Sequence, residues 1–179
     1  YNRREPALVS NYPFPRIPYY EALEKYGSDK PDLRNPLIIE DCTDIFENSD
    51  FKIFSDKISK GNVVKGIKIK NTEDKSRSFF DKLNNWAREE GAPGLGYITL
   101  VGTQYKGPIA KNLSDNKLSQ LNLNAGDSIF FICDKLKDAQ LFSGKIRDKL
   151  CLEMNLLDKN SFNFCWIVDF PMFEMDEKT

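Results

Sequence analysis

The stretch that decides the fold is SRSFFDKLNNWAREE, residues 76–90, which carries the clearest helical pattern in the sequence. Its apolar residues recur at intervals of three and four and therefore share one side of a helix: Phe79, Phe80, Leu83, Trp86 and Ala87. Ser78 with Asp81 suits the start of this helix, and Gly91 followed by Pro93 suits its end. We predict a helix that packs on a sheet.

The sheet is predicted on both sides of this helix. Within residues 63–70, isoleucines alternate with lysines, which is typical of a half-buried strand. Phe51 to Phe54 is predicted as a second strand, joined to the first as an antiparallel hairpin. Two strands, over 97–101 and 128–133, are expected after the helix.

A second long helix is predicted over 136–154, where apolar residues again share one side. The order from residue 51 is then strand, strand, helix, strand, strand, helix. The sequence therefore predicts an α+β fold, a two-layer sandwich whose four-stranded antiparallel sheet carries both helices on one face.

The flanks of this central part carry shorter elements. Residues 19–26 are predicted as a short helix, 37–39 as a short buried strand, and 41–46 as a single helical turn. The apolar run from Phe162 to Phe173 is strand-like until Pro171. Because the central sheet already has its four strands, we expect this last strand to pair within the flanks.

The stretch YGSDKPDLR, residues 26–34 and here called the junction loop, concentrates charge beside turn residues. Gly27 ends the preceding helical pattern. Asp29 stands beside Lys30, and Asp32 lies two residues before Arg34, so pairing within the loop could hold it in one conformation. The pattern leaves two alternatives open, a self-satisfied structural turn or a loop that positions something.

Composition excludes several kinds of active site. The 179 residues contain no histidine, which removes histidine bases, histidine-activated nucleophiles and histidine zinc ligands. The four cysteines are far apart and are expected to be reduced, mostly buried thiols of a cytoplasmic protein. Gly94 and Gly96 precede a predicted strand rather than a helix, so they do not form a phosphate-binding loop.

Charge is unevenly distributed although the net charge is −1. Residues 51–160 hold 19 basic and 13 acidic residues, whereas the flanks hold 7 basic and 14 acidic residues. Lys65, Lys68 and Lys70, on or beside one predicted strand, are the candidates for contact with a nucleic-acid backbone. The alternative is an ordinary solvated lysine-rich face. No apolar run approaches the length of a membrane span, and the missing initial Met suggests a piece of a longer chain.

Two flank stretches resemble bacterial aspartyl-tRNA synthetases. The first is PRIPYYEA, residues 15–22, together with the junction loop, and the second is WIVDFPMFE, residues 166–174. The segment between them stands where these enzymes carry an inserted GAD domain, a module shared with the B subunit of tRNA-dependent amidotransferases. The resemblance implies class II catalytic-domain flanks over 1–44 and 159–179 and the inserted domain over 45–158.

The resemblance implies a parent enzyme that activates aspartate with ATP and Mg²⁺ and transfers it to tRNA, as a cytoplasmic homodimer. It places no catalytic or metal-binding residue on this chain, so we expect the chain alone to be inactive and to bind no cofactor. Asp29, Lys30, Asp32 and Arg34 are then expected to stabilise the domain junction. An accessory tRNA-binding module, as in the amidotransferases, is the alternative. Whether the parent also charges asparagine tRNA stays open.

Overall fold

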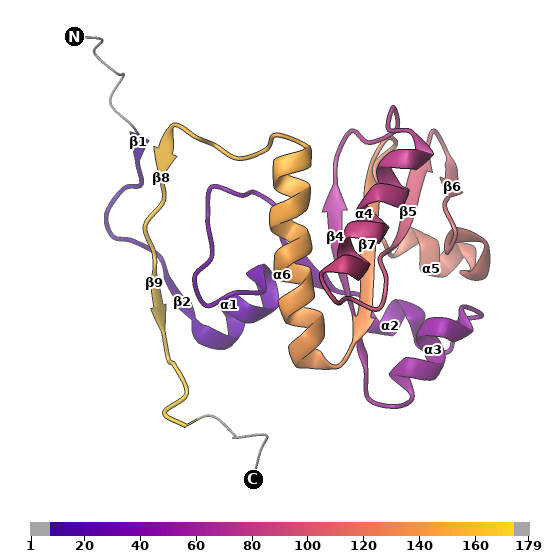
Figure 1. The fold of residues 1–179 in the computed structure, drawn as a ribbon, viewed down its shortest axis with the longest axis horizontal. Helices are drawn as coiled ribbons and strands as arrows, with labels where there is room; N and C mark the ends of the chain where they lie inside the picture. The colour runs from indigo at the N-terminus through magenta and orange to yellow at the C-terminus, as the bar shows by residue number, and fades with distance from the viewer. Residues whose placement is uncertain (1–7, 174–179) are drawn as a thin grey trace.

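A five-stranded antiparallel sheet forms the centre of the larger part of the molecule (Figure 1). The computed structural model describes residues 8–173. The strands lie in the order β3 (Ile39–Asp41), β4 (Val63–Ile69), β7 (Ser128–Asp134), β5 (Gly96–Val101) and β6 (Gln104–Lys106). The middle strand, β7, is buried from Ser128 to Cys133, as expected for an apolar run with a neighbour on each side.

The predicted sheet included one wrong strand and lacked two of the five real ones, β3 and β6. Residues 51–54 do not form a hairpin strand, because α3 (Lys52–Ile58) begins there and Ser55 N donates to Phe51 O over 3.1 Å. The rings of Phe51 and Phe54 stand one helical turn apart, with centroids 4.9 Å apart. The true neighbours of β4 are β3 and β7, and β6 was not predicted at all.

Both predicted long helices are present and cover one face of the sheet. They are α4 (Arg77–Glu89) and α6 (Leu136–Glu153). Their apolar sides meet the sheet in one core cluster, which includes Phe80, Leu83, Ala87, Ile146 and Leu150. The predicted bounds of α4, 76–90, are confirmed to within one residue, but the predicted capping residue was wrong, since Ser76 rather than Ser78 precedes the first turn and makes no side-chain capping bond.

The opposite face of the sheet is covered as well, which the two-layer prediction did not include. Four short helices lie on that side: α2 (Thr43–Phe46), α3, the 3₁₀ turn η1 (Ala110–Asn112) and α5 (Asp115–Ser119). A second core cluster joins them to the sheet, with Phe46, Ile109, Leu121, Ile129 and Phe131 fully buried. Both faces of the central strands are therefore buried away from solvent.

The flanks form two short parallel strand pairs and one helix. β1 (Leu8–Val9) pairs with β8 (Ser161–Phe162), and β2 (Arg16–Pro18) pairs with β9 (Trp166–Val168). The expectation that the last strand pairs within the flanks is confirmed. Helix α1 (Tyr19–Tyr26) follows β2 and packs on α6, which lies between the flank and the sheet (Figure 1).

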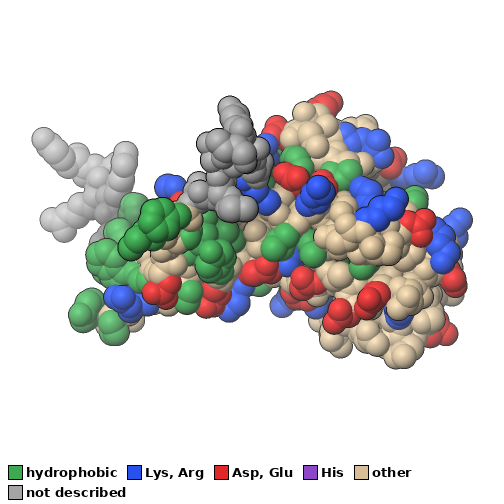
Figure 2. All heavy atoms as spheres, turned by 90° about the horizontal axis from the view of Figure 1, so that it is seen from below, with side chains coloured by type: hydrophobic (Ala, Val, Ile, Leu, Met, Phe, Trp, Pro, Cys, Tyr) green, Lys and Arg blue, Asp and Glu red, His purple; other side chains and the backbone are tan. Residues whose placement is uncertain are grey.

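Large apolar side chains are exposed on the flank elements, where Figure 2 shows them gathered at one end of the molecule. Tyr12, Phe162, Phe164, Trp166 and Phe170 are all more than half exposed. Residues 1–7 and 174–179, including Glu174 of the second family-like stretch, lie outside the described residues. Since β3 pairs with β4, the central sheet begins at Ile39, inside the range expected as flank.

Candidate functional site at the junction loop

The junction loop begins in direct backbone contact with α6. Gly27 has φ of +68° and ends α1 by donating its N–H to Leu23 O over 3.0 Å. A Cβ atom on Gly27 would lie 2.5 Å from Gln140 O, and one on Gly144 would lie 2.6 Å from Gly27 O. Only a pair of glycines permits this approach between loop and helix.

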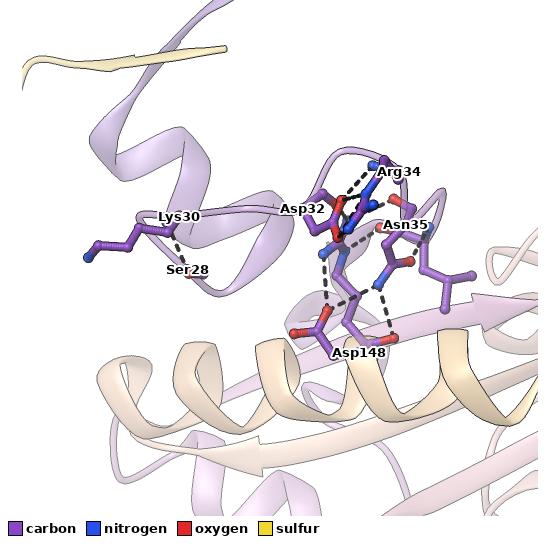
Figure 3. A network of polar contacts seen from close by, with 8 residues as sticks. Ser28, Lys30, Asp32, Arg34, Asn35 and Asp148 are labelled. Atoms are coloured by element: carbon purple, nitrogen blue, oxygen red, sulfur yellow. Dashed lines mark hydrogen bonds and ion pairs between the residues drawn. The ribbon is translucent and has the colours of Figure 1, made fainter. Parts of the chain in front are cut away.

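The charged residues of the loop pair with one another, as the sequence predicted. Lys30 Nζ lies 2.8 Å from Asp29 Oδ2. Arg34 holds Asp32 through two nitrogens, with Nη2 2.7 Å from Oδ2 and Nε 2.9 Å from Oδ1 (Figure 3). The hydrogen bond from the Arg34 side chain is the largest contribution that keeps the pKa of Asp32 below its ordinary value. This two-point contact gives the loop a defined shape.

A buried arginine of α6, Arg147, holds the polypeptide at the end of the loop. Its side chain is 2% exposed, and its donors reach three backbone carbonyls. Nε donates to Leu37 O over 2.6 Å, while Nη2 donates to Asn35 O over 2.8 Å and to Asp32 O over 3.0 Å. Burial lowers the pKa of Arg147. One side chain thus satisfies three carbonyls that water cannot reach freely.

Asn35 completes this network beside Arg147 (Figure 3). Its Nδ2 donates to Asp148 Oδ1 over 3.1 Å and to Arg147 O over 3.3 Å, and its Oδ1 accepts from Leu37 N over 3.0 Å. The buried amide is therefore bonded through both its nitrogen and its oxygen. The network attaches the segment after the junction loop to the middle of α6.

Lys65 forms a second connection between the flank and the sheet. Its Nζ lies 2.5 Å from Glu24 Oε2 of α1 and 2.9 Å from Asp41 Oδ2 of β3. Gln140 of α6 donates to the other Glu24 oxygen over 2.7 Å. Burial alone would lower the pKa of Lys65, but the two carboxylates outweigh it and the pKa is raised. With its side chain 1% exposed, Lys65 is not the surface lysine that the sequence suggested.

This cluster makes the stability of the fold depend on pH. Burial by itself raises the pKa of Asp41, but hydrogen bonds from Thr43 and Lys65 outweigh it, so the folded-state pKa lies below the ordinary value. Such a carboxylate stabilises the fold above its unfolded-state pKa, and that contribution is lost as the pH falls through the folded-state pKa. We expect the free energy of unfolding to decline below about pH 4.

Urea unfolding of Asp41→Asn, measured at neutral and at acid pH, checks this dependence. The variant should be less stable at neutral pH and should lose less stability on acidification than the original chain. Asp50→Asn, at an exposed position, is the matched control and should follow the original decline. An Asp41→Asn variant with an unaltered pH dependence would contradict the assignment.

Lys68 and Lys70 lie on the other side of β4 from Lys65. Lys68 Nζ is 2.8 Å from Glu40 Oε2. Both lysines line a hollow of about 770 Å³, between the end of β4 and the end of α6. The rest of its wall combines apolar, amide and acidic side chains: Pro36, Leu37, Ile38, Met154, Leu156, Asn71, Asn122, Asn124, Glu40 and Asp127. The structure therefore separates the three lysines that the sequence grouped.

Neither metal binding nor thiol chemistry at Cys42 or Cys133 is supported by the described side chains. In the range 8–173, no group of three or more Cys, Asp or Glu residues is placed to hold a metal ion. Burial raises the pKa of Cys42 to about 12 and that of Cys133 to about 11, so both thiols are protonated and unreactive near neutral pH. Among the described helices, none combines the length and apolarity that crossing a membrane requires.

Sequence reasoning missed Arg147, Glu24 and Gln140. Arg147 follows the predicted apolar position Ile146, and its partners are mainly backbone carbonyls, which leave no trace in a sequence pattern. Glu24 meets Lys65 across 41 residues, and Gln140 meets Glu24 across 116. One sequence signal was available: Arg147 lies next to the buried apolar side of α6, where its charge could be expected to be enclosed.

Comparison with known proteins shows which proteins this chain is similar to. The GAD domain model matches residues 54–141. Three curated relatives share the name aspartate--tRNA(Asp/Asn) ligase: those of Gluconobacter oxydans, Paramagnetospirillum magneticum and Acidiphilium cryptum. They are 48%, 50% and 51% identical over 175 residues, which is 96% of this chain.

The chain spans only 29%, 20% and 29% of the lengths of these three relatives. The matched region nevertheless includes both the junction loop with its flank and the sheet domain, as the resemblance of the flanking stretches implied. About half of the residues are identical across this region. Over nearly its whole length the chain is therefore similar to a segment of bacterial aspartate–tRNA ligases, and residues 54–141 match the GAD domain model.

Proposed function

We propose that this chain acts as the GAD-containing segment of an aspartate–tRNA ligase, which activates aspartate with ATP and transfers it to tRNA. The observation that carries the proposal is the identity of 48–51% with three ligases over 96% of the chain. The free cysteines, three of them buried, are consistent with the reducing cytoplasm in which we place the enzyme. We take the parent to be a homodimer.

Within the parent, we assign a positioning role to the junction loop rather than a chemical one. The charges of Asp29, Lys30, Asp32 and Arg34 are paired within the loop, and Arg147 attaches the following segment to α6. These contacts support a fixed orientation of the GAD domain on its flanks. The described residues do not supply a fitting site for Mg²⁺, so we derive no step of the ATP reaction from them.

Activity assays on two proteins, the chain alone and a chimeric ligase that contains it, test the proposal. The chain alone should show only background aspartate-dependent ATP–pyrophosphate exchange, because the family resemblance places no catalytic residue on it. The same chain, substituted for the matched segment of the Gluconobacter oxydans ligase, should support exchange and tRNA aspartylation. Robust exchange by the chain alone would contradict the positioning role. A folded chimera without activity would contradict the ligase assignment.

A second candidate function is that of an accessory tRNA-binding module, and the hollow beside Lys68 and Lys70 favours it. Two lysines and three asparagines there offer donors to phosphate and sugar oxygens, beside the carboxylates of Glu40, which is paired with Lys68, and Asp127. We disfavour the amidotransferase context, because the relatives reported above are ligases and match the flanks too. Loss of tRNA binding in Lys68→Gln/Lys70→Gln would support this candidate, and unchanged binding would exclude the hollow as the tRNA-binding surface.

A further inference from the structure

Helix α4 presents a polar stripe on the side that does not face the core. Arg77, Asp81, Asn84 and Arg88 follow one another at intervals of four, three and four residues, so they lie along one side of the helix. The apolar side of α4 is buried on the sheet. The stripe therefore extends along the surface for three turns.

Two adjoining hollows border this stripe and share Asn84, Leu95 and Pro108 in their walls. The first, of about 500 Å³, lies between Arg77 and Tyr97. The second, of about 220 Å³, extends to Arg88 and to Lys57 of α3. Together they form a groove, here called the α4 groove, that brings cations from two helices to one surface.

The fold holds Arg88 beside the backbone of the groove. A Cβ atom on Gly94 would lie 3.3 Å from Arg88 Nη2, so the guanidinium extends over a residue without a side chain. Asn84 Oδ1 accepts from Leu95 N over 2.8 Å and fixes the same loop. Lys57 Nζ donates one hydrogen bond, to Cys133 O over 3.3 Å, and an ammonium has two further protons to donate.

The charge and length of the α4 groove suit a polyanion. Three cations face one carboxylate, Asp81, and the Arg77–Asp81 pair is loose at 3.7 Å with the arginine side chain 88% exposed. Eleven residues separate Arg77 from Arg88, a rise of about 16 Å along the helix. A single phosphate cannot reach both arginines, whereas successive phosphates of one strand can.

The other residues that line the α4 groove are mainly aromatic or apolar, which suits contact with nucleotide bases rather than with further phosphates. Tyr97 lines the groove, and its ring is stacked on that of Phe80 with centroids 4.1 Å apart. Phe51 and the exposed Ile53 line the other hollow. Aromatic and apolar surfaces beside a basic track are the features by which proteins hold unpaired nucleotides.

We propose that the α4 groove binds a single-stranded RNA segment, with Arg77, Arg88 and Lys57 on its phosphates and Tyr97 against a base. Guanidinium groups match the paired oxygens of a phosphate. The choice of RNA over an acidic peptide rests on the proposed function in a tRNA ligase. This surface is separate from the hollow of Lys68 and Lys70.

Fluorescence anisotropy with a labelled single-stranded RNA of about 12 nucleotides tests the proposal. We expect Arg77→Gln/Arg88→Gln to weaken binding at least about tenfold at low salt. The slope of log affinity against log salt should fall by about 1.4, the amount expected when two phosphate contacts are lost from a single strand. Arg77→Lys/Arg88→Lys should keep most of the slope while losing part of the affinity.

Lys25→Gln/Lys159→Gln removes the same charge from exposed flank positions and should leave binding unchanged. Because both arginines are exposed, the variants should melt at the temperature of the original chain. Equal RNA binding by Arg77→Gln/Arg88→Gln, or no RNA binding by the original chain, would overturn the proposal. Loss only in Lys68→Gln/Lys70→Gln would also overturn it, as would binding of polyglutamate as tightly as RNA. None of these results affects the exchange activity of the chimera, on which the ligase assignment depends.

Discussion

Replacing Arg147 by alanine is expected to lower the free energy of unfolding by about 3 to 5 kcal/mol. The guanidinium is enclosed, and it donates to Leu37 O, Asn35 O and Asp32 O. Truncation leaves these carbonyls without their charged donor and opens a cavity beside the Tyr26 ring, 5.1 Å from the guanidinium carbon. The lost hydrogen bonds are those that connect the junction loop and the segment after it to α6.

Urea unfolding followed by circular dichroism measures this loss. Arg147→Lys should be intermediate, because an ammonium retains the charge but cannot reproduce the planar fork that spans several carbonyls. Arg77→Ala is the matched control, since it removes an arginine that is 88% exposed, and its effect should stay within about 0.5 kcal/mol. If Arg147→Ala unfolded like Arg77→Ala, the network would not stabilise the junction.

The sequence was most informative where a pattern is local and repeated. The spacing of Phe80, Leu83 and Ala87 predicted α4, and the isoleucines at 67 and 69 predicted β4. The pairs of the junction loop were also predictable, because Asp32 and Arg34 stand two residues apart and need no distant partner.

The misassigned segments lacked such a repeat. Phe51 and Phe54 fit either a short strand or one turn of a helix, and in the helix that forms the Phe54 ring packs 4.9 Å from the Phe46 ring. The edge strand β6 is three residues long, too short for an alternation to be recognised. The secondary structure of both segments therefore depends on tertiary contacts rather than on a local sequence pattern.

Charge was harder to interpret than apolarity, because its meaning depends on partners far away in the sequence. Lys65, Lys68 and Lys70 look equivalent in the sequence. The strand pleat sends Lys65 to the opposite face from Lys68, where Glu24 and Asp41 enclose it. The α4 groove shows the converse, since Lys57 and Arg88 come together although 31 positions separate them.

Gly144→Ala is expected to destabilise the chain by about 2 kcal/mol, although the same change inside a helix ordinarily stabilises by about 1 kcal/mol. Alanine has the higher helix propensity, so propensity alone predicts a gain. The added Cβ would stand 2.6 Å from Gly27 O, an atom of the backbone that cannot rotate away. Either the junction loop or α6 must shift, and the shift would also disturb the Arg147 network one turn further along α6.

The sign of the change in unfolding free energy shows whether the steric clash with Gly27 or the higher helix propensity of alanine dominates. Asn85→Ala, at an exposed position of α4, is the matched control and should stabilise slightly, because it changes propensity without a new contact. In urea unfolding we therefore expect opposite signs for the two variants. A stabilised Gly144→Ala would mean that the loop and α6 can separate without loss, and the junction would then not hold the GAD domain rigidly on its flanks. A destabilised variant would instead show that the close backbone approach of Gly27 and Gly144 contributes to that attachment.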